Sequence, residues 1–93
     1  MFIGRVIGSI WATRKEQSLS GLKLLVVKPL DILTGRGDES PIVAADIIGA
    51  GVGETVLIVQ GSSARTAVGS ASVSVDATVV AIVDDNEINR DLL

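Results

Sequence analysis

Three alternating glycines, Gly49, Gly51 and Gly53, form the part of this sequence whose spacing is closest to that of a ligand-binding loop. The glycine-rich loops of nucleotide-binding proteins hold phosphate with backbone amides at the start of a helix. Here the glycines precede residues 55–59, which are rich in β-branched side chains and predict a strand. The chain also has no Gly-Lys-Ser/Thr sequence. The pattern therefore favours a tight turn or a close approach of two backbones over a phosphate site.

Asp46 is the acidic residue of an otherwise apolar stretch, 42–48. A buried carboxylate without a partner is costly, so we expect Asp46 to have one. The candidate partner is Arg65, through a fixed ion pair or a capped turn. A catalytic acid is the alternative, but the chain has no histidine and no second carboxylate at a suggestive spacing. We therefore expect no catalytic residue.

Ser62 and Ser63 follow the strand predicted over 55–60 and precede a short helical pattern. Their hydroxyls and amides are candidate anion ligands, and Ser62 is equally a candidate helix N-cap, with Gly69 as the helix stop. The chain contains neither histidine nor cysteine. The commonest general base and the usual zinc ligands are thus missing, and we expect no metal and no cofactor.

The charge and the aromatic content argue against nucleic-acid binding. Eight Lys and Arg residues are scattered among eleven acids, giving a net charge of −3. Binding to nucleic acid draws most of its affinity from basic residues that neutralise phosphates. Single-strand binders also stack bases on aromatic side chains, and Phe2 and Trp11 are the only aromatic residues. Both requirements fail together.

The elements that position these residues are predicted to be short strands. Strands are expected over 2–12, 22–30, 42–48, 55–60 and 78–83, with a helical turn over 61–69. Gly4 and Gly8 in the first strand predict a bulge or a strong bend. The predicted fold class is all-β: a small five-stranded OB-like barrel with one short helical turn before the last strand. One barrel domain over 1–84 is expected, followed by a polar tail over 85–93.

The chain has more apolar residues than a core of this size needs. Of its 93 residues, 47% are hydrophobic, yet no apolar run approaches the roughly 20 residues of a membrane helix. We expect the surplus to line an oligomer interface. The strand predicted over 22–30 is apolar on both faces at Leu24, Leu25, Val26 and Val27. Its second face is covered either by a neighbouring subunit or by a loop of the same chain. Trp11 is a candidate interface anchor or a cap on the barrel core.

Three blocks of residues carry a resemblance to a known family. The first runs from Asp46 through Gly49-Ala50-Gly51 and Gly53-Glu54 to Gly61-Ser62-Ser63-Ala64-Arg65. The second is Lys15 to Val27, with its Leu-x-Gly-x-Lys-hydrophobic pattern, and the third is Asp76 to Asp84. In this order they resemble the bacterial microcompartment vertex proteins, the family of carboxysome and ethanolamine-utilisation shell pentamers. Thr78, where the family has a second alanine, and Val75, where proline is common, are mild departures.

The resemblance implies a structural protein rather than an enzyme. The expected role is a homopentamer that caps the fivefold vertices of a shell built from hexameric shell proteins, inside the bacterial cytoplasm, with no nucleic-acid or membrane partner. Candidate interface residues lie on two strands: Leu24, Leu25, Val26, Val27, Val80 and Ile82. Gly49, Gly51 and Gly53 then either line a narrow axial opening or simply form a tight turn. The mixed-charge stretch Arg14, Lys15 and Glu16 is either a rim that touches flat shell tiles or a solvated loop.

The resemblance leaves two other function classes to be weighed. One is an OB-fold nucleic-acid module, which predicts a basic groove and an aromatic platform. The other is a small-ligand or enzyme domain that works as an oligomer, for which the glycine-rich loop is the one hint.

Overall fold

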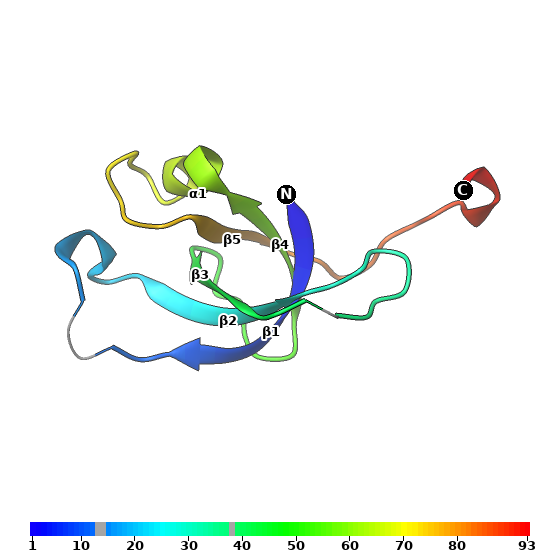
Figure 1. The fold of residues 1–93 in the computed structure, drawn as a ribbon, viewed down its shortest axis with the longest axis horizontal. Coiled ribbons are helices and arrows are strands. Elements are labelled where there is room, and N and C mark those ends of the chain that lie inside the picture. The colour runs from blue at the N-terminus through cyan, green and yellow to red at the C-terminus, as the bar shows by residue number, and fades with distance from the viewer. Residues whose placement is uncertain (13–14, 38) are drawn as a thin grey trace.

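The computed structural model describes residues 1–12, 15–37 and 39–93. Within these ranges, five strands close into a barrel in the order β1, β2, β3, β5, β4, and β4 pairs back onto β1. Figure 1 shows the strands of the barrel and the extended tail that follows the last strand. The elements in chain order are β1 (Phe2–Ile10), the 3₁₀ turn η1 (Gln17–Leu19), β2 (Lys23–Pro29), β3 (Ile42–Asp46), β4 (Thr55–Gln60), α1 (Gly61–Ala67), β5 (Ala77–Ile82) and the 3₁₀ turn η2 (Arg90–Leu92).

The strands are joined by antiparallel pairs and by one short parallel pair. β1 pairs with β2 and β4, β2 with β3, and β4 with β5, all antiparallel. The barrel closes where β3 and β5 run parallel, with Ala45 opposite Thr78 and Asp46 opposite Val79. The predicted all-β barrel with one short helix before the last strand is confirmed.

The two glycines of β1 occur for different structural reasons. The register between β1 and β2 shifts between Val6 and Gly8, so the predicted bulge lies at Ile7. At Gly4 the two strands approach closely. A Cβ added there would lie 2.5 Å from a methyl group of Val27 and 3.0 Å from the carbonyl oxygen of Lys28. Glycine is therefore required at this position by space rather than by backbone conformation.

The helix α1 follows β4 without a loop. Its N-cap residue is Gln60, and no side chain caps the helix. The predicted N-cap at Ser62 is therefore wrong, because the chain turns into the helix at Gly61, whose φ of 62° suits glycine. The predicted stop at Gly69 is confirmed. The Gly69 amide donates to the carbonyl of Thr66 at 3.0 Å, and its φ is 105°, as expected for the left-handed residue that ends a helix.

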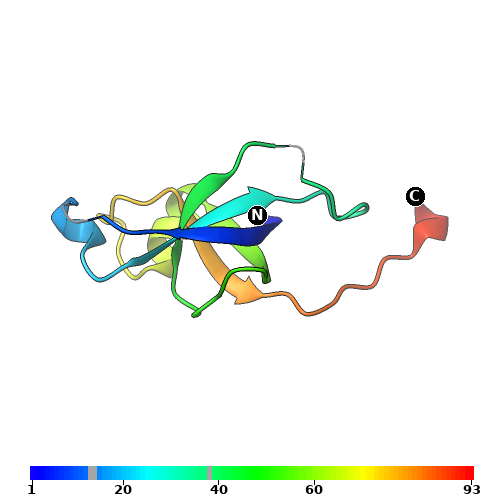
Figure 2. The ribbon, with the colours of Figure 1, turned by 90° about the horizontal axis from the view of Figure 1, so that it is seen from below.

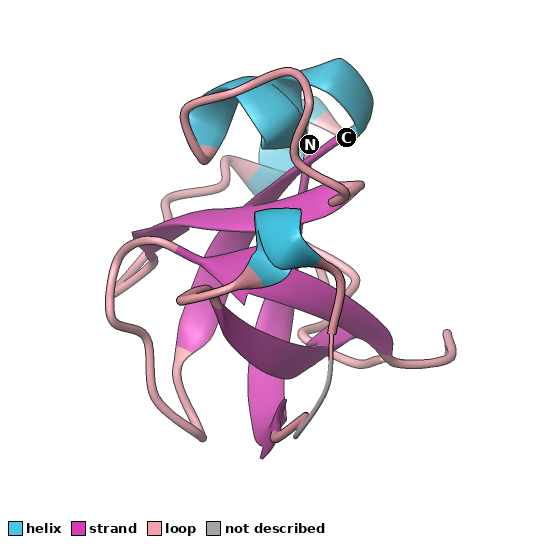
Figure 3. Ribbon diagram, turned by 90° about the vertical axis from the view of Figure 1, so that its left-hand side faces the viewer, coloured by secondary structure: helices cyan, strands magenta, loops and turns pink. Residues whose placement is uncertain are grey.

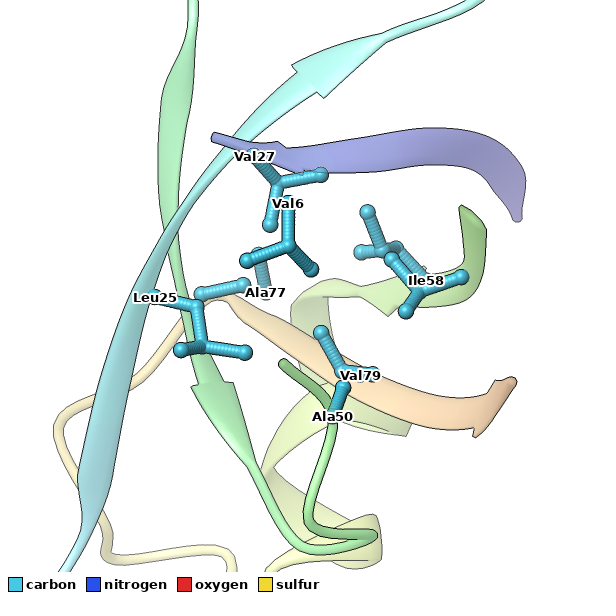
Figure 4. Close-up of a cluster of buried hydrophobic side chains, with 9 residues drawn as sticks. Val6, Leu25, Val27, Ala50, Ile58, Ala77 and Val79 are labelled. Carbon is cyan, nitrogen blue, oxygen red and sulfur yellow. The ribbon is translucent and has the colours of Figure 1, made fainter. Parts of the chain in front are cut away.

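The core is made by every second residue of the strands. Figure 4 shows these side chains meeting inside the barrel. The largest fully buried hydrophobic side chains are Leu25, Ile58, Val6, Val27, Val56 and Val79. Alanines complete the packing where there is less room, at Ala44, Ala50 and Ala77. Because strand side chains alternate between two faces, the residues in between point out of the barrel.

α1 packs on the outside of β4 and β5, and Figure 3 shows the helices lying outside the strands. Ala64 of the helix is fully buried against the barrel. Thr78 of β5 is also fully buried, and its hydroxyl donates to the carbonyl of Ala64 at 2.9 Å. This bond satisfies the buried hydroxyl of Thr78 and fixes α1 on β5.

The residues after β5 extend away from the barrel. Figures 1 and 2 show them running to a tip that lies far from the strands. The described chain accordingly measures 49 Å along its longest axis, against 24 and 21 Å along the others. The domain boundary predicted at residue 84 stays a prediction.

Candidate functional site

The loop between β3 and β4 is organised by the carboxylate of Asp46, whose side chain is 1% exposed. One oxygen accepts from the amides of Ile48 at 3.0 Å and Gly49 at 3.2 Å. The other accepts from Gly49 at 3.1 Å and from Ala50 at 2.9 Å. An aspartate at the start of a loop often binds backbone amides two to four residues ahead in this way. The buried charge is satisfied by local backbone.

The second half of the loop is fixed by Glu54 and by β1. The amide of Gly51 donates to the side chain of Glu54 at 2.6 Å. The amide of Val6 donates to the carbonyl of Glu54 at 3.0 Å, and that of Gly53 donates to the carbonyl of Val6 at 2.8 Å. Both ends of the loop are thus tied to the barrel. Gly49 and Gly53 have φ of 89° and 93°, values that only glycine adopts readily.

The loop has the amides of an anion site, but its own carboxylates occupy them. The amides of Ile48, Gly49 and Ala50 bond Asp46, and that of Gly51 bonds Glu54. A phosphate would have to displace two carboxylates that are part of the fold, and it would meet their negative charge. The geometry therefore agrees with a structural turn rather than a phosphate-binding loop.

The predicted ion pair between Asp46 and Arg65 is not formed. The cation near Asp46 is Lys23, whose Nζ lies 3.8 Å from the carboxylate and donates to the carbonyl of Ala50 at 2.9 Å. Arg65 instead donates to the carbonyl of Val75 at 3.4 Å, beyond the end of its own helix. β2 pairs Lys23 directly opposite Asp46, so the register between two strands supplies the partner. The predicted pairing of distant residues was wrong because this register cannot be read from the sequence.

The predicted interface residues of β2 lie on opposite faces of the strand. Leu25 and Val27 are fully buried in the core of their own barrel, so their side chains are not available to a partner. Leu24 and Val26 point outward and are half-buried. The interface prediction is therefore wrong for Leu25 and Val27, whereas for Leu24 and Val26 it stays a prediction.

The outward residues of β2 belong to a larger apolar surface, which we call the first wall. Ile10 of β1 lies directly opposite Leu24, and Val43 of β3 lies directly opposite Val26. Ile10 and Val43 are 40% and 46% exposed. Four apolar side chains thus share one outer face across three strands. Cross-strand neighbours of this kind form a continuous surface.

A second apolar row, the second wall, lies on the other side of the barrel. Ile3 of β1 pairs with Leu57 of β4, which pairs in turn with Ala81 of β5. The three side chains are half-buried, and Leu57 stands between the core residues Val56 and Ile58. Of the remaining predicted interface residues, Val80 is half-buried at an irregularity of the β4–β5 pairing, and Ile82 packs against the core.

The remaining sequence candidates lie on the surface. Ser62 and Ser63 are exposed on the first turn of the seven-residue helix α1. Trp11 is 93% exposed, so it does not cap the barrel core. In the predicted rim, the Glu16 carboxylate binds the hydroxyl and the amide of Ser18, and these bonds lower the pKa of Glu16 below its ordinary value. Arg14 lies outside the described residues.

The ends of the β1–β2 pair each border a hollow. A pocket of about 630 Å³ lies where β1 begins and β2 ends, and another of about 380 Å³ lies where β1 ends and β2 begins. Across residues 1–12, 15–37 and 39–93, no three acidic side chains gather as the ligands of a metal ion would. In the same ranges no helix has the length and apolar character needed to span a bilayer.

Comparison with known proteins gives one consistent family. The family model described as "Ethanolamine utilisation protein EutN/carboxysome" matches residues 1–84. The microcompartment shell vertex protein GrpN of Rhodospirillum rubrum is 47% identical over 89 residues, covering 94% of this chain and 97% of that protein. The carboxysome shell vertex protein CcmL of Synechococcus elongatus is 48% identical, covering 90% and 84%.

Solved structures agree with the sequence matches. The structure described as the GrpN pentameric microcompartment shell protein from Rhodospirillum rubrum superposes with a TM-score of 0.86 at 45% identity, covering 96% of this chain and all of that one. A structure of the ethanolamine utilization protein EutN superposes with a TM-score of 0.89 at 43% identity, covering 95% and 91%.

Proposed function

The chain belongs to the EutN/carboxysome family, and we propose that it forms a homopentamer. This pentamer closes the fivefold vertices of a bacterial microcompartment shell. The observation that carries the proposal is the match to shell vertex proteins over nearly the whole chain, including GrpN, whose structure is described as pentameric. The nucleic-acid and small-ligand alternatives have no such support. The chain acts within the shell, in the cytoplasm, next to other shell proteins.

The function is geometric. A sheet of flat hexagonal tiles closes into a shell only where fivefold units replace sixfold ones. A ring of five needs a heterologous contact, in which one surface of each subunit meets a different surface of the next, at a rotation that closes. A closed ring leaves no unmatched surface within itself, and its rim remains free to contact the surrounding tiles.

The two apolar walls supply the different surfaces that such a contact requires. The first wall (Ile10, Leu24, Val26 and Val43) lies on β1, β2 and β3, and the second wall (Ile3, Leu57 and Ala81) lies on β1, β4 and β5. In the barrel order, β2 and β4 lie on the two sides of β1. We expect the first wall of one subunit to pack on the second wall of the next. This contact uses the apolar surplus of the chain, because apolar area removed from water stabilises an interface.

The loop that Asp46 organises presents a further apolar surface. Ile47 and Ile48 are each 44% exposed, and Val52 is 67% exposed. Hydrophobic tips on a loop held at both ends are suited to a contact that forms without reordering the backbone. We expect this loop to meet a neighbour in the assembled shell. That Gly49, Gly51 and Gly53 border an axial opening stays a prediction.

The proposed function requires no bond-making. The relatives are named as structural shell components, and the glycine-rich loop has its amides filled by Asp46 and Glu54. What the role demands is complementary shape and a ring of defined size. We accordingly assign no catalytic residue to the chain.

Native mass spectrometry at low micromolar concentration tests the proposal. We expect a fivefold multiple of the 9.6 kDa chain. Val26→Glu places a charge in the first wall and should dissociate the ring without unfolding the barrel. Ala71→Glu adds the same charge at an exposed loop position and should leave the ring intact. A monomeric wild type, or a ring of another size, contradicts the proposal.

A further inference from the structure

The residues after β5 end in an exposed apolar tip. Directly after β5, the amide of Val83 donates to the carbonyl of Thr55 at 2.8 Å. The chain then runs out to η2 (Arg90–Leu92), as Figures 1 and 2 show. Leu92 and Leu93 at the tip are 83% and 76% exposed. A single 3₁₀ turn has little stability of its own, so two adjacent leucines on it are suited to burial against something else.

One contact joins this tip to the β2–β3 loop. The guanidinium of Arg90 donates to the carbonyl of Leu33 at 2.7 Å. That carbonyl belongs to a compact turn in which Asp31 accepts from the amides of Leu33 at 2.8 Å and Thr34 at 3.1 Å. The turn is closed by the amide of Asp31, which donates to the carbonyl of Arg36 at 2.7 Å. The tip is thus hydrogen-bonded to an ordered turn, and its two leucines remain exposed to solvent.

The pocket of about 630 Å³ is large enough to bury the two leucine side chains of a tip. Its hydrophobic lining comes mainly from the first strand, the loop that follows the second strand and the middle of the fourth strand: Phe2, Ile3, Leu30, Ile32 and Leu57. Pockets of a few hundred cubic ångströms with such a lining commonly bury apolar groups. Ile3 and Leu57 also belong to the second wall, so the pocket continues a surface already expected to meet the next subunit.

We infer that Leu92 and Leu93 of one subunit dock in this pocket of a neighbouring subunit. The inference rests on the proposed pentamer. Reach allows it, because the nine residues from Asp84 to Leu92 span about 30 Å when extended. This length exceeds both shorter dimensions of the chain, 24 and 21 Å. Within one subunit the two leucines stay 83% and 76% exposed although the turn that Arg90 contacts lines that subunit's own pocket, which favours the pocket of a neighbour.

The charges predict how the docking responds to salt. The tail carries four acids, Asp84, Asp85, Glu87 and Asp91, and one base, Arg90. The pocket is lined by one base, Arg36, and by the acids Asp31 and Glu39. With the amino group of Met1, which also lines the pocket, the positive and negative charges there balance, so apolar contact rather than charge must hold the acidic tip in place. Raising the salt from about 0.1 M to about 1 M shortens the screening length from about 10 Å to about 3 Å and should therefore change the docking little.

Cross-linking between differently labelled subunits tests the inference, since the chain has no cysteine of its own. Isotope-labelled chains with only Leu57→Cys are assembled with unlabelled chains carrying only Leu92→Cys, and the rings are oxidised. We expect a disulfide between a heavy and a light chain, with a yield that changes little between low and high salt. The matched control replaces Leu57→Cys by Ala71→Cys, an exposed position in the α1–β5 loop at the opposite end from the tail (Figure 1), and should give no such product.

The outcomes separate the two proposals. A pentamer by native mass spectrometry with no heavy–light product above the Ala71 control overturns the tail docking alone. A chain that carries both Leu57→Cys and Leu92→Cys and closes only on itself, at 9.6 kDa, does the same by placing the tip in its own pocket. A monomeric wild type overturns both proposals. As an independent readout, Leu92→Asp with Leu93→Asp should make the ring dissociate at a protein concentration at least about tenfold higher, while an unchanged dissociation would contradict the inference.

Discussion

Replacing Asp46 by asparagine tests how the loop between β3 and β4 is built. The two carboxylate oxygens accept from the amides of Ile48, Gly49 and Ala50 at distances between 2.9 and 3.2 Å. Asparagine has the same shape, but one of its two polar atoms is a donor. At least one amide of the loop must then face an NH₂ group instead of an oxygen.

The size of the effect follows from which amide loses its acceptor. Ala50 is fully buried, whereas Ile48 is 44% exposed, so the loss of an acceptor costs less at Ile48 than at Ala50. We expect the asparagine to keep its oxygen on Ala50 and to lose the bond to Ile48. An unpaired donor costs about 1–3 kcal/mol, and each remaining bond weakens by about 1 kcal/mol when its acceptor is no longer charged. With two bonds remaining, from Gly49 and Ala50, the expected loss in the free energy of unfolding is about 3–5 kcal/mol.

Chemical denaturation at one fixed protein concentration measures this loss, because the stability of a ring depends on subunit concentration. The control is Lys23→Met. It removes the bond from Nζ to the carbonyl of Ala50, but the Lys23 side chain is 52% exposed, so we expect about 1 kcal/mol or less. The reasoning is refuted if Asp46→Asn changes the free energy of unfolding by less than about 0.5 kcal/mol, or if Lys23→Met lowers it by more than Asp46→Asn does.

Three further predictions concern the strands and the β2–β3 turn. Leu25→Ala empties part of the core and should lower the stability of the barrel by about 2–5 kcal/mol, whereas Leu24→Glu should dissociate the ring and leave the circular dichroism of the barrel unchanged. Equal effects of the two variants on ring and barrel would contradict the assignment of opposite faces. Gly4→Ala should cost about 1–3 kcal/mol in thermal or chemical unfolding because its Cβ would lie 3.0 Å from a backbone oxygen, and a neutral result would mean that β1 shifts freely. The pKa of Asp31 lies below its ordinary value of 3.8, because the amides of Thr34 and Leu33 bond the charged form. This contribution to stability is present above the unfolded pKa and is lost as the pH falls through the lower folded value, so an NMR titration that gives 3.8 or more for this carboxyl would contradict it.

The architecture was open to prediction because local patterns agree with it. The β-branched stretch 55–60 and the apolar residues of 22–30 occur as strands, and Gly69 ends the helix before the last strand. What the pattern did not decide was which face of β2 points inward. Leu24, Leu25, Val26 and Val27 are all apolar, so alternation gives no direction. The choice depends on the register with β1, where Val27 meets Val6 inside the barrel.

The partner of Asp46 illustrates the same division between local and distant information. Its hydrogen bonds to Ile48, Gly49 and Ala50 lie within four residues, and an aspartate followed by a glycine three residues on is a signal for such a turn. That signal was available in the sequence. The proximity of Lys23, by contrast, arises from the pairing of β2 with β3 and is not encoded in spacing along the chain. Neither the local signal nor the strand pairing links Arg65 to Asp46, which is why the predicted pair is wrong.

Cryo-electron microscopy of shells assembled with hexameric shell proteins, with and without this chain, tests the central claim most directly. The vertex role predicts closed shells in the presence of the chain, with fivefold density at each vertex that fits five copies of the barrel. Without the chain, it predicts vertices that lack this density, or elongated and unclosed shells. Barrel density at sites other than the fivefold vertices, or the same filled vertices without the chain, would contradict the account.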